Sequence, residues 1–176
     1  MFRANQPRGF WLIALMLCLA LVGLAFAPIS AISDNAIAEK KIFVLQRGTP
    51  AAIPNFVDLV VGCDWAGIGG QVFDQAGSPM NGLLVKISGT LGGRQILKYV
   101  YTGSSQYFGP GGFDLKLVDH PVSSQTLTLQ VLDAAGVRRS AAFPLTTYAT
   151  CQQNLLVVNL VEVSLDRTIY LPLISR

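Results

Sequence analysis

Short runs in which apolar and polar residues alternate make up most of the chain after residue 62. Val85 and Ile87 alternate with polar neighbours, and residues 113–117 and 126–131 show the same period of two. Because successive side chains of a strand point to opposite faces, each run predicts a strand with one face in a core. The residues expected to point into one shared core are Leu83, Val85, Ile87, Phe113, Leu115, Leu117, Leu127, Leu129 and Val131.

Turn residues separate these runs. Gly92 and Gly93 predict a tight hairpin between strands at 83–88 and 95–102, because both glycines tolerate positive φ. Residues 75–79 and 133–136 predict turns, and the glycine-rich stretch 103–112 predicts a longer loop. Further strands are predicted at 56–61, 67–74, 137–145 and 155–163. The last of these is apolar on both faces, which favours a central strand or one covered on both sides.

Short strands at this spacing predict an all-β fold, a Greek-key β-sandwich of about seven to nine strands. The organisation expected along the chain has four parts. They are a signal peptide or membrane anchor at 1–38, an entry segment at 39–62, the sandwich at 63–163 and a C-terminal edge strand or tail at 164–176. Pro172 confines that last part to an edge, because proline cannot donate to a sheet ladder.

The N-terminal segment has the pattern of an export leader. Arg3 and Arg8 precede a nearly continuous apolar run from Phe10 to Phe26, which predicts a hydrophobic helix. A cleaved signal peptide and a retained anchor both fit this pattern. Cleavage is favoured because the run is short for a membrane span and Pro28 follows it. We expect the mature N-terminus between residues 32 and 39.

Charge and cysteine content narrow the class of protein and its cellular compartment further. The chain has 13 basic and 10 acidic residues, a net charge of +3, and no long basic run. This distribution does not fit a nucleic-acid-binding protein. Of the three cysteines, Cys18 lies in the leader, which leaves Cys63 and Cys151. A pair of cysteines in an exported chain predicts a disulfide, with two free buried thiols as the alternative.

The spacing of glycine and apolar residues from 68 to 89 resembles the opening of carboxypeptidase regulatory-like domains, which are transthyretin-like β-sandwiches. The residues that carry this resemblance are Ile68, Gly70, Val72, Asp74, Gly77, Pro79, Gly82, Val85, Ile87 and Gly89. Thr102 and Phe113 resemble the segment that follows in that family, although a long loop separates them here. The frame of Cys63, Cys151 and residues 170–173 is similar to exported proteins of Chloroflexus-type bacteria. The resemblance implies the fold and leaves the activity open, since such modules occur in many functional contexts.

No motif in the sequence indicates catalysis or a metal site. The single histidine, His120, lies between Asp119 and Pro121, which predicts a polar turn between strands. No activating partner for His120 is identifiable, so we predict no catalytic residues. Cys63, Cys151 and one histidine make a poor zinc set, and the turn carboxylates are better explained as caps of backbone amides. We therefore predict neither a metal nor another cofactor.

Aromatic residues are the main indication of binding. Tyr99 and Tyr101 share one strand face because they lie two residues apart, and Tyr107 and Phe108 follow on the next loop. These four rings are candidates for stacking on a sugar or contacting a protein; ordinary half-buried strand aromatics are the alternative.

Three functional hypotheses follow, and the two that rank first are non-enzymatic. The first is an exported β-sandwich module with a structural or protein-interaction role at the cell surface. The second is a carbohydrate- or peptide-binding module that uses the four aromatic residues. A small secreted hydrolase ranks third. The expected partner is a cell-surface protein or glycan and not a nucleic acid, with membrane contact only through the N-terminal segment if that is retained.

Overall fold

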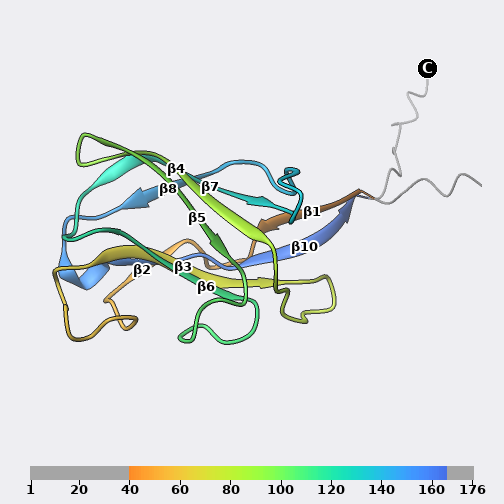
Figure 1. Cartoon of the computed structure of the whole chain (residues 1–176), viewed down its shortest axis with the longest axis horizontal. Helices are drawn as coiled ribbons and strands as arrows, with labels where there is room; N and C mark the ends of the chain where they lie inside the picture. The colour runs from red at the N-terminus through yellow and green to blue at the C-terminus, as the bar shows by residue number, and fades with distance from the viewer. Residues whose placement is uncertain (1–39, 166–176) are drawn as a thin grey trace, which may run out of the picture. The chain divides into compact units, whose positions relative to one another are not determined.

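The computed structural model describes residues 40–165, and this part of the chain is built from strands with no α-helix (Figure 1). The predicted leader helix and the tail after residue 165 lie outside the described residues. The elements are β1 (Lys40–Leu45), β2 (Ala51–Ile53), β3 (Ala66–Phe73), β4 (Leu84–Leu91), β5 (Arg94–Tyr101), β6 (Gly112–Val118), β7 (Ser124–Leu132), β8 (Phe143–Thr147), the 3-10 turn η1 (Cys151–Gln153), β9 (Leu155–Val157) and β10 (Leu160–Leu165).

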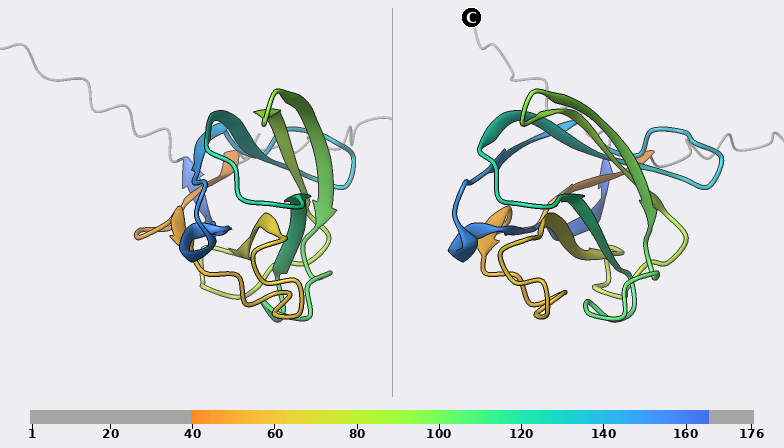
Figure 2. Two further views of the ribbon diagram at one scale, coloured as in Figure 1. Left: turned by 90° about the vertical axis from the view of Figure 1, so that its left-hand side faces the viewer. Right: turned by 60° about the vertical axis from the view of Figure 1, so that its left-hand side comes forward.

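These strands form two sheets. The larger sheet has the order β1-β10-β3-β9-β2, with β6 paired to the other edge of β3, and the smaller sheet has the order β5-β4-β7-β8. Strand β3 runs parallel to β9 and β10, whereas its pairing with β6 is antiparallel. In the right-hand view of Figure 2, β4, β5 and β7 arch over the larger sheet. The prediction of an all-β fold with two packed sheets is confirmed.

The core lies between the two sheets and contains the residues that the alternating pattern selected. Val85 and Ile87 of β4 are fully buried, as are Leu127, Leu129 and Val131 of β7. From the larger sheet, Phe113 and Leu117 of β6 enter the same core; Leu83 and Leu115 pack against it at half burial. The register of these strands is therefore the one that the sequence predicted, since a slip of one residue would turn each apolar set outward.

The hairpin at Gly92 and Gly93 is also confirmed. The two glycines have φ values of 57° and 75°, and they join β4 to β5 with Leu91 opposite Arg94. Positive φ at both positions is the requirement of a two-residue turn whose twist matches its flanking strands. Glycine meets this requirement without steric strain.

Three predicted strands differ from the structure. The strand expected at 56–61 is wrong, because Asn55 Oδ1 accepts hydrogen bonds from the amides of Val57 and Asp58 and bends the chain into turns. The strand expected at 137–145 starts only at Phe143. The strand expected at 155–163 is interrupted after Val157, so it appears as β9 and β10. Together with β1 and β2 from the entry segment, this break gives ten strands.

The interruption between β9 and β10 has a clear polar cause. The Asn159 side-chain oxygen accepts a hydrogen bond from the amide of Gln71 on β3 at 3.0 Å. The backbone of Asn159 bonds in turn to the Thr49 hydroxyl and to the amide of Gln46. One asparagine thus joins the larger sheet to the connection between β1 and β2, and regular pairing resumes on either side of it.

A second, smaller apolar cluster covers the outer face of the larger sheet. It contains Val57, Trp65 and Leu155, with Phe108 packed against them. Gly67 and Gly69 of β3 face this cluster, and a Cβ at either position would collide with the ring of Trp65 or Phe108. The cluster explains why the segment that begins at Leu155 is apolar on both faces, as the sequence predicted for a strand covered on both sides.

Candidate functional site

A row of exposed apolar side chains follows the outward face of β5. Leu97, Tyr99 and Tyr101 are 61%, 48% and 54% exposed, whereas Ile96 and Val100 on the other face of the strand pack against the core. The alternation follows from strand geometry, which places every second side chain on the same face. β5 is the edge strand of the smaller sheet, so this row is open along its length. We call Gln95, Leu97, Tyr99 and Tyr101 the β5 row.

Polar side chains on the neighbouring strands border the β5 row. Lys86 of β4 lies opposite Tyr99, and Ser88 lies opposite Leu97. The hydroxyl of Ser88 is 3.2 Å from that of Thr128 on β7. Residues directly opposite each other in an antiparallel pair share a face. The outward face of the smaller sheet therefore combines exposed rings at its edge with hydrogen-bonding groups beside them.

The structure does not bring all four predicted aromatic residues together. Tyr99 and Tyr101 lie on the smaller sheet, but Tyr107 and Phe108 belong to the 103–111 loop beside the larger sheet. Phe108 is half-buried, and its ring centroid is 5.2 Å from that of Phe56. Figure 2 shows the 103–111 loop beside the 55–64 loop, at the end of β5 that it follows. Phe108 is therefore a packing residue, whereas its neighbour Tyr107 is exposed.

The loop that carries Phe56 also exposes two aliphatic residues. Leu59 is 75% and Val60 is 98% exposed, and both lie between Asn55 and Cys63 in a segment of consecutive turns. We call Phe56, Leu59, Val60 and Tyr107 the loop patch. Exposed apolar residues of this kind occur singly on most proteins, but a group on adjoining loops indicates a contact surface.

Cys63 and Cys151 form a disulfide beside the loop patch. Their Cα atoms are 5.1 Å apart, within the range that a disulfide requires. The bond joins the end of the 55–64 loop to η1, just before β9. A disulfide at this place fits an oxidising compartment.

His120 lies in the bend after β6 and lines a groove of about 320 Å³ between the β4–β5 hairpin and the 119–122 segment. Arg94 and Gln95 line the same groove, whose apolar wall includes Leu91 and Ile96. The neighbouring carboxylate of Asp119 is held by Lys116 Nζ at 2.8 Å. This hydrogen bond and the charge of Lys116 lower the pKa of Asp119, so its carboxylate stays charged to a lower pH than an ordinary aspartate does.

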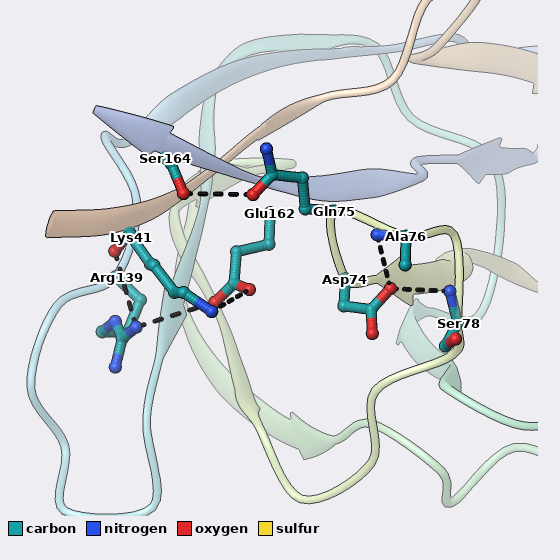
Figure 3. A network of polar contacts seen from close by, with 8 residues as sticks. All are labelled: Lys41, Asp74, Gln75, Ala76, Ser78, Arg139, Glu162 and Ser164. Carbon is teal, nitrogen blue, oxygen red and sulfur yellow. Dashed lines mark hydrogen bonds and ion pairs between the residues drawn. The ribbon is translucent and has the colours of Figure 1, made fainter. Parts of the chain in front are cut away.

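Three other carboxylates serve the fold. Asp74 Oδ1 accepts the amides of Ala76 and Ser78, as Figure 3 shows, and Asp133 caps its own turn in the same way. Both were predicted as caps. Glu162 is buried on β10, 3.5 Å from Lys41 and 3.9 Å from Arg139. Within residues 40–165, no three His, Cys, Asp or Glu side chains gather as a metal site requires.

Comparisons with known proteins give no family. No family model and no curated protein matches the chain. Among solved structures, it is similar to the dioxygenase domain of a dioxygenase carbohydrate-binding protein fusion from the cellulolytic bacterium Streptomyces sp. SirexAA-E. The identity is 13%, the TM-score is 0.36, and the match covers 66% of this chain and 94% of that one. A likeness at this level carries no argument about function. In the described part of the chain, no helix has the length and hydrophobicity needed to cross a membrane.

Sequence reasoning missed several residues of this surface. Leu97 has the same period-two spacing as Tyr99 and Tyr101, so the pattern could have revealed it. Lys86 becomes part of the surface only through the β4–β5 register. Arg94 and His120 line one groove because β5 and the end of β6 approach each other, and nothing in the local sequence indicates this.

Proposed function

We propose that this chain is an exported, non-enzymatic Greek-key β-sandwich module that binds a glycan on the outward face of β5 and β4. The observation that carries the proposal is the β5 row, in which Leu97, Tyr99 and Tyr101 stand half-exposed side by side on an open edge strand. Export is supported by the N-terminal apolar run and by the disulfide between Cys63 and Cys151.

Glycan binding fits this surface better than a purely structural role does. Rings two residues apart on a strand are separated by about 7 Å, so adjacent sugar units can each meet one ring. Tyrosine offers an apolar face and a hydroxyl group, which matches the mixed character of a sugar ring. Lys86 and Ser88 supply donors and acceptors for the hydroxyl groups of the same ligand.

A contact function also fits the chemistry of the polar groups. Asp74 and Asp133 cap turns, Asp119 is paired with Lys116, and Glu162 is paired with Lys41 and Arg139. Each of these carboxylates already has a structural partner, and hydrolytic catalysis needs a base that is oriented toward a nucleophile or water.

The proposal is tested by replacing Tyr99 and Tyr101 together with serine in the exported protein. Affinity electrophoresis in gels that contain neutral or acidic polysaccharides measures the binding. We expect the double variant to lose retention by about tenfold or more, because each ring contributes stacking and buried area. Tyr148→Ser is the matched control, since Tyr148 is exposed after β8 and away from the β5 row. Unchanged retention of the double variant would refute the proposal.

Protein contact at the loop patch is the second candidate function. The exposure of Leu59 and Val60 favours it, because the disulfide holds their loop in place at one end. In a pull-down from cell-surface proteins, this function predicts a partner that is lost with Leu59→Ser and Val60→Ser. The Tyr99 and Tyr101 variants would retain that partner.

A further inference from the structure

A groove lies between the start of β5 and the end of β6, where the edges of the two sheets face each other. Its volume is about 320 Å³, which falls within the range of about 300–1,000 Å³ typical of small-molecule sites. The β4–β5 hairpin forms one rim and the 119–122 segment forms the other. Figure 1 shows both rims at the end of the unit opposite to the paired ends of β1 and β10.

The wall of the groove is aliphatic. Leu91 and Leu117 are buried, and Ile96, Val118 and Val122 pack beside them at partial burial. These residues come from β4, from the inward face of β5, and from the end of β6 with the segment after it, so both sheets contribute to the wall. A surface of this kind is stabilised when hydrocarbon covers it and displaces water.

Basic groups outnumber acidic ones around this wall. Arg94 and His120 line the groove, and Lys98 follows on the inward face of β5, where its Nζ is bonded to the β6 carbonyls. The acidic lining residue is Asp119, whose side chain is 88% exposed and bonded to Lys116 at 2.8 Å. That bond lowers the pKa of Asp119 most, and the charges of His120 and Lys98 lower it further. The groove therefore lies in a positive field, which attracts anions.

Arg94 is the cation that remains available to a ligand. It is exposed, and within residues 40–165 it forms no ion pair, whereas Lys98 and Lys116 already have partners. A guanidinium group can present two parallel N–H donors to one carboxylate. Because Arg94 and Ile96 share one face of β5, a carboxylate on Arg94 leaves the rest of its molecule beside the aliphatic wall.

We propose that this groove binds a small amphipathic carboxylic acid. Its carboxylate pairs with Arg94, and its hydrocarbon body covers the wall of Leu91, Ile96 and Leu117. At about 30 Å³ for each water of the liquid, the groove holds the equivalent of about ten waters, which is room for an acid of roughly eight carbon atoms. The site is distinct from the β5 row, whose side chains lie on the opposite face of the strand, although Gln95 borders both.

The test uses the full exported protein and isothermal titration with octanoate, its neutral analogue octanamide, and acetate, which lacks the hydrocarbon body. We expect octanoate to bind at least tenfold more tightly than either analogue, because it alone offers both the charge and the apolar body. Arg94→Gln should weaken octanoate binding by about tenfold. Arg94→Lys keeps the charge but loses the paired donors, so it should weaken binding by about threefold. Arg138→Gln, in the turn between β7 and β8, should bind like the parent protein.

Methyl NMR spectra recorded with octanoate locate the ligand, with shifts expected at Leu91, Ile96 and Leu117. No binding of octanoate, equal binding of octanamide, or unchanged binding in Arg94→Gln would each overturn the proposal. Tighter binding of a short peptide that ends in a free leucine carboxylate would overturn it in favour of a peptide C-terminus. The Tyr99 and Tyr101 double variant should bind octanoate normally, and a loss there would place the acid on the β5 row instead of in the groove.

Discussion

Asn154 shows how one buried amide orders a surface that is otherwise made of loops. Its Oδ1 accepts the backbone amide of Asn55 at 2.7 Å, and its Nδ2 donates to the carbonyls of Gly62 and Trp65 at 3.1 Å and 2.8 Å. The side chain thus fixes both ends of the 55–64 loop. It stands three residues after Cys151, so the disulfide and the amide restrain the same loop independently.

Replacement of Asn154 by aspartate should therefore destabilise the protein. The variant keeps the acceptor but loses both donors, and it places a carboxylate against two carbonyl oxygens in a buried site. We expect a loss of about 2–4 kcal/mol in the free energy of unfolding, measured by urea denaturation. Asn81→Asp is the control, because the exposed Asn81 uses its Oδ1 as an acceptor for Gly111. Equal stability of the two variants would contradict this account.

At the scale of elements, Lys98 connects the edges of the two sheets. It belongs to the inward-facing set of β5, and its Nζ donates to the carbonyls of Lys116 and Leu117 on β6 at 2.7 Å and 3.3 Å. β6 is an edge strand of the larger sheet. An inward-pointing charge on an edge is a known protection against pairing with other chains.

Lys98→Met should weaken this junction. Methionine keeps a long apolar stem but removes both charge-assisted hydrogen bonds and leaves the β6 carbonyls open. We expect a loss of about 1–3 kcal/mol in stability and increased light scattering on storage, as the edge pairs with other copies. Lys86→Met removes a lysine that faces outward from the adjacent strand, so it should change stability by less than about 0.5 kcal/mol. A Lys98 variant as stable and soluble as this control would refute the edge role.

The strands that could be predicted from the sequence are those whose alternation is set by a single core. This holds for β4, β6 and β7, where every second residue is apolar and a turn residue closes each run. Prediction failed where a polar side chain redirected the backbone. Asn55 converts an apolar segment into turns, and Asn159 divides a continuous apolar run into β9 and β10. The Asn159 bond has a partner distant in sequence, Gln71, and so leaves no local pattern. The Asn55 turn is local, but the apolar residues that follow it gave the segment the appearance of a strand.

The candidate site could be predicted only in part for the same reason. The shared face of Tyr99 and Tyr101 follows from their spacing alone. The separation of Phe108 from that face could not be predicted, because it depends on the docking of the Phe108 ring over Gly69 of β3. The groove between Arg94 and His120 likewise requires the approach of two strands that belong to different sheets.

At the scale of the whole described unit, the restraints on the loops and the proposed binding face lie on different sheets. The disulfide, Asn154 and the second apolar cluster restrain the outer side of the larger sheet. The β5 row lies on the outward face of the smaller sheet. The shared core, which the alternating residues of both sheets fill, lies between the two surfaces.

Removal of the disulfide should therefore lower stability without changing the affinity for a glycan. The bond closes a loop with a sequence separation of 88 residues, which corresponds to about 4.6 kcal/mol in the chain-entropy model. We expect the double variant Cys63→Ser with Cys151→Ser to lose about 3–4 kcal/mol in the free energy of unfolding, measured by urea denaturation. It should bind oligosaccharide with unchanged affinity well below its melting temperature.

Intact mass after alkylation, with and without reductant, establishes the bond in the exported parent protein. Two freely alkylated thiols in unreduced protein would contradict the disulfide. A folded double variant that no longer binds would show instead that the loop side of the larger sheet takes part in recognition.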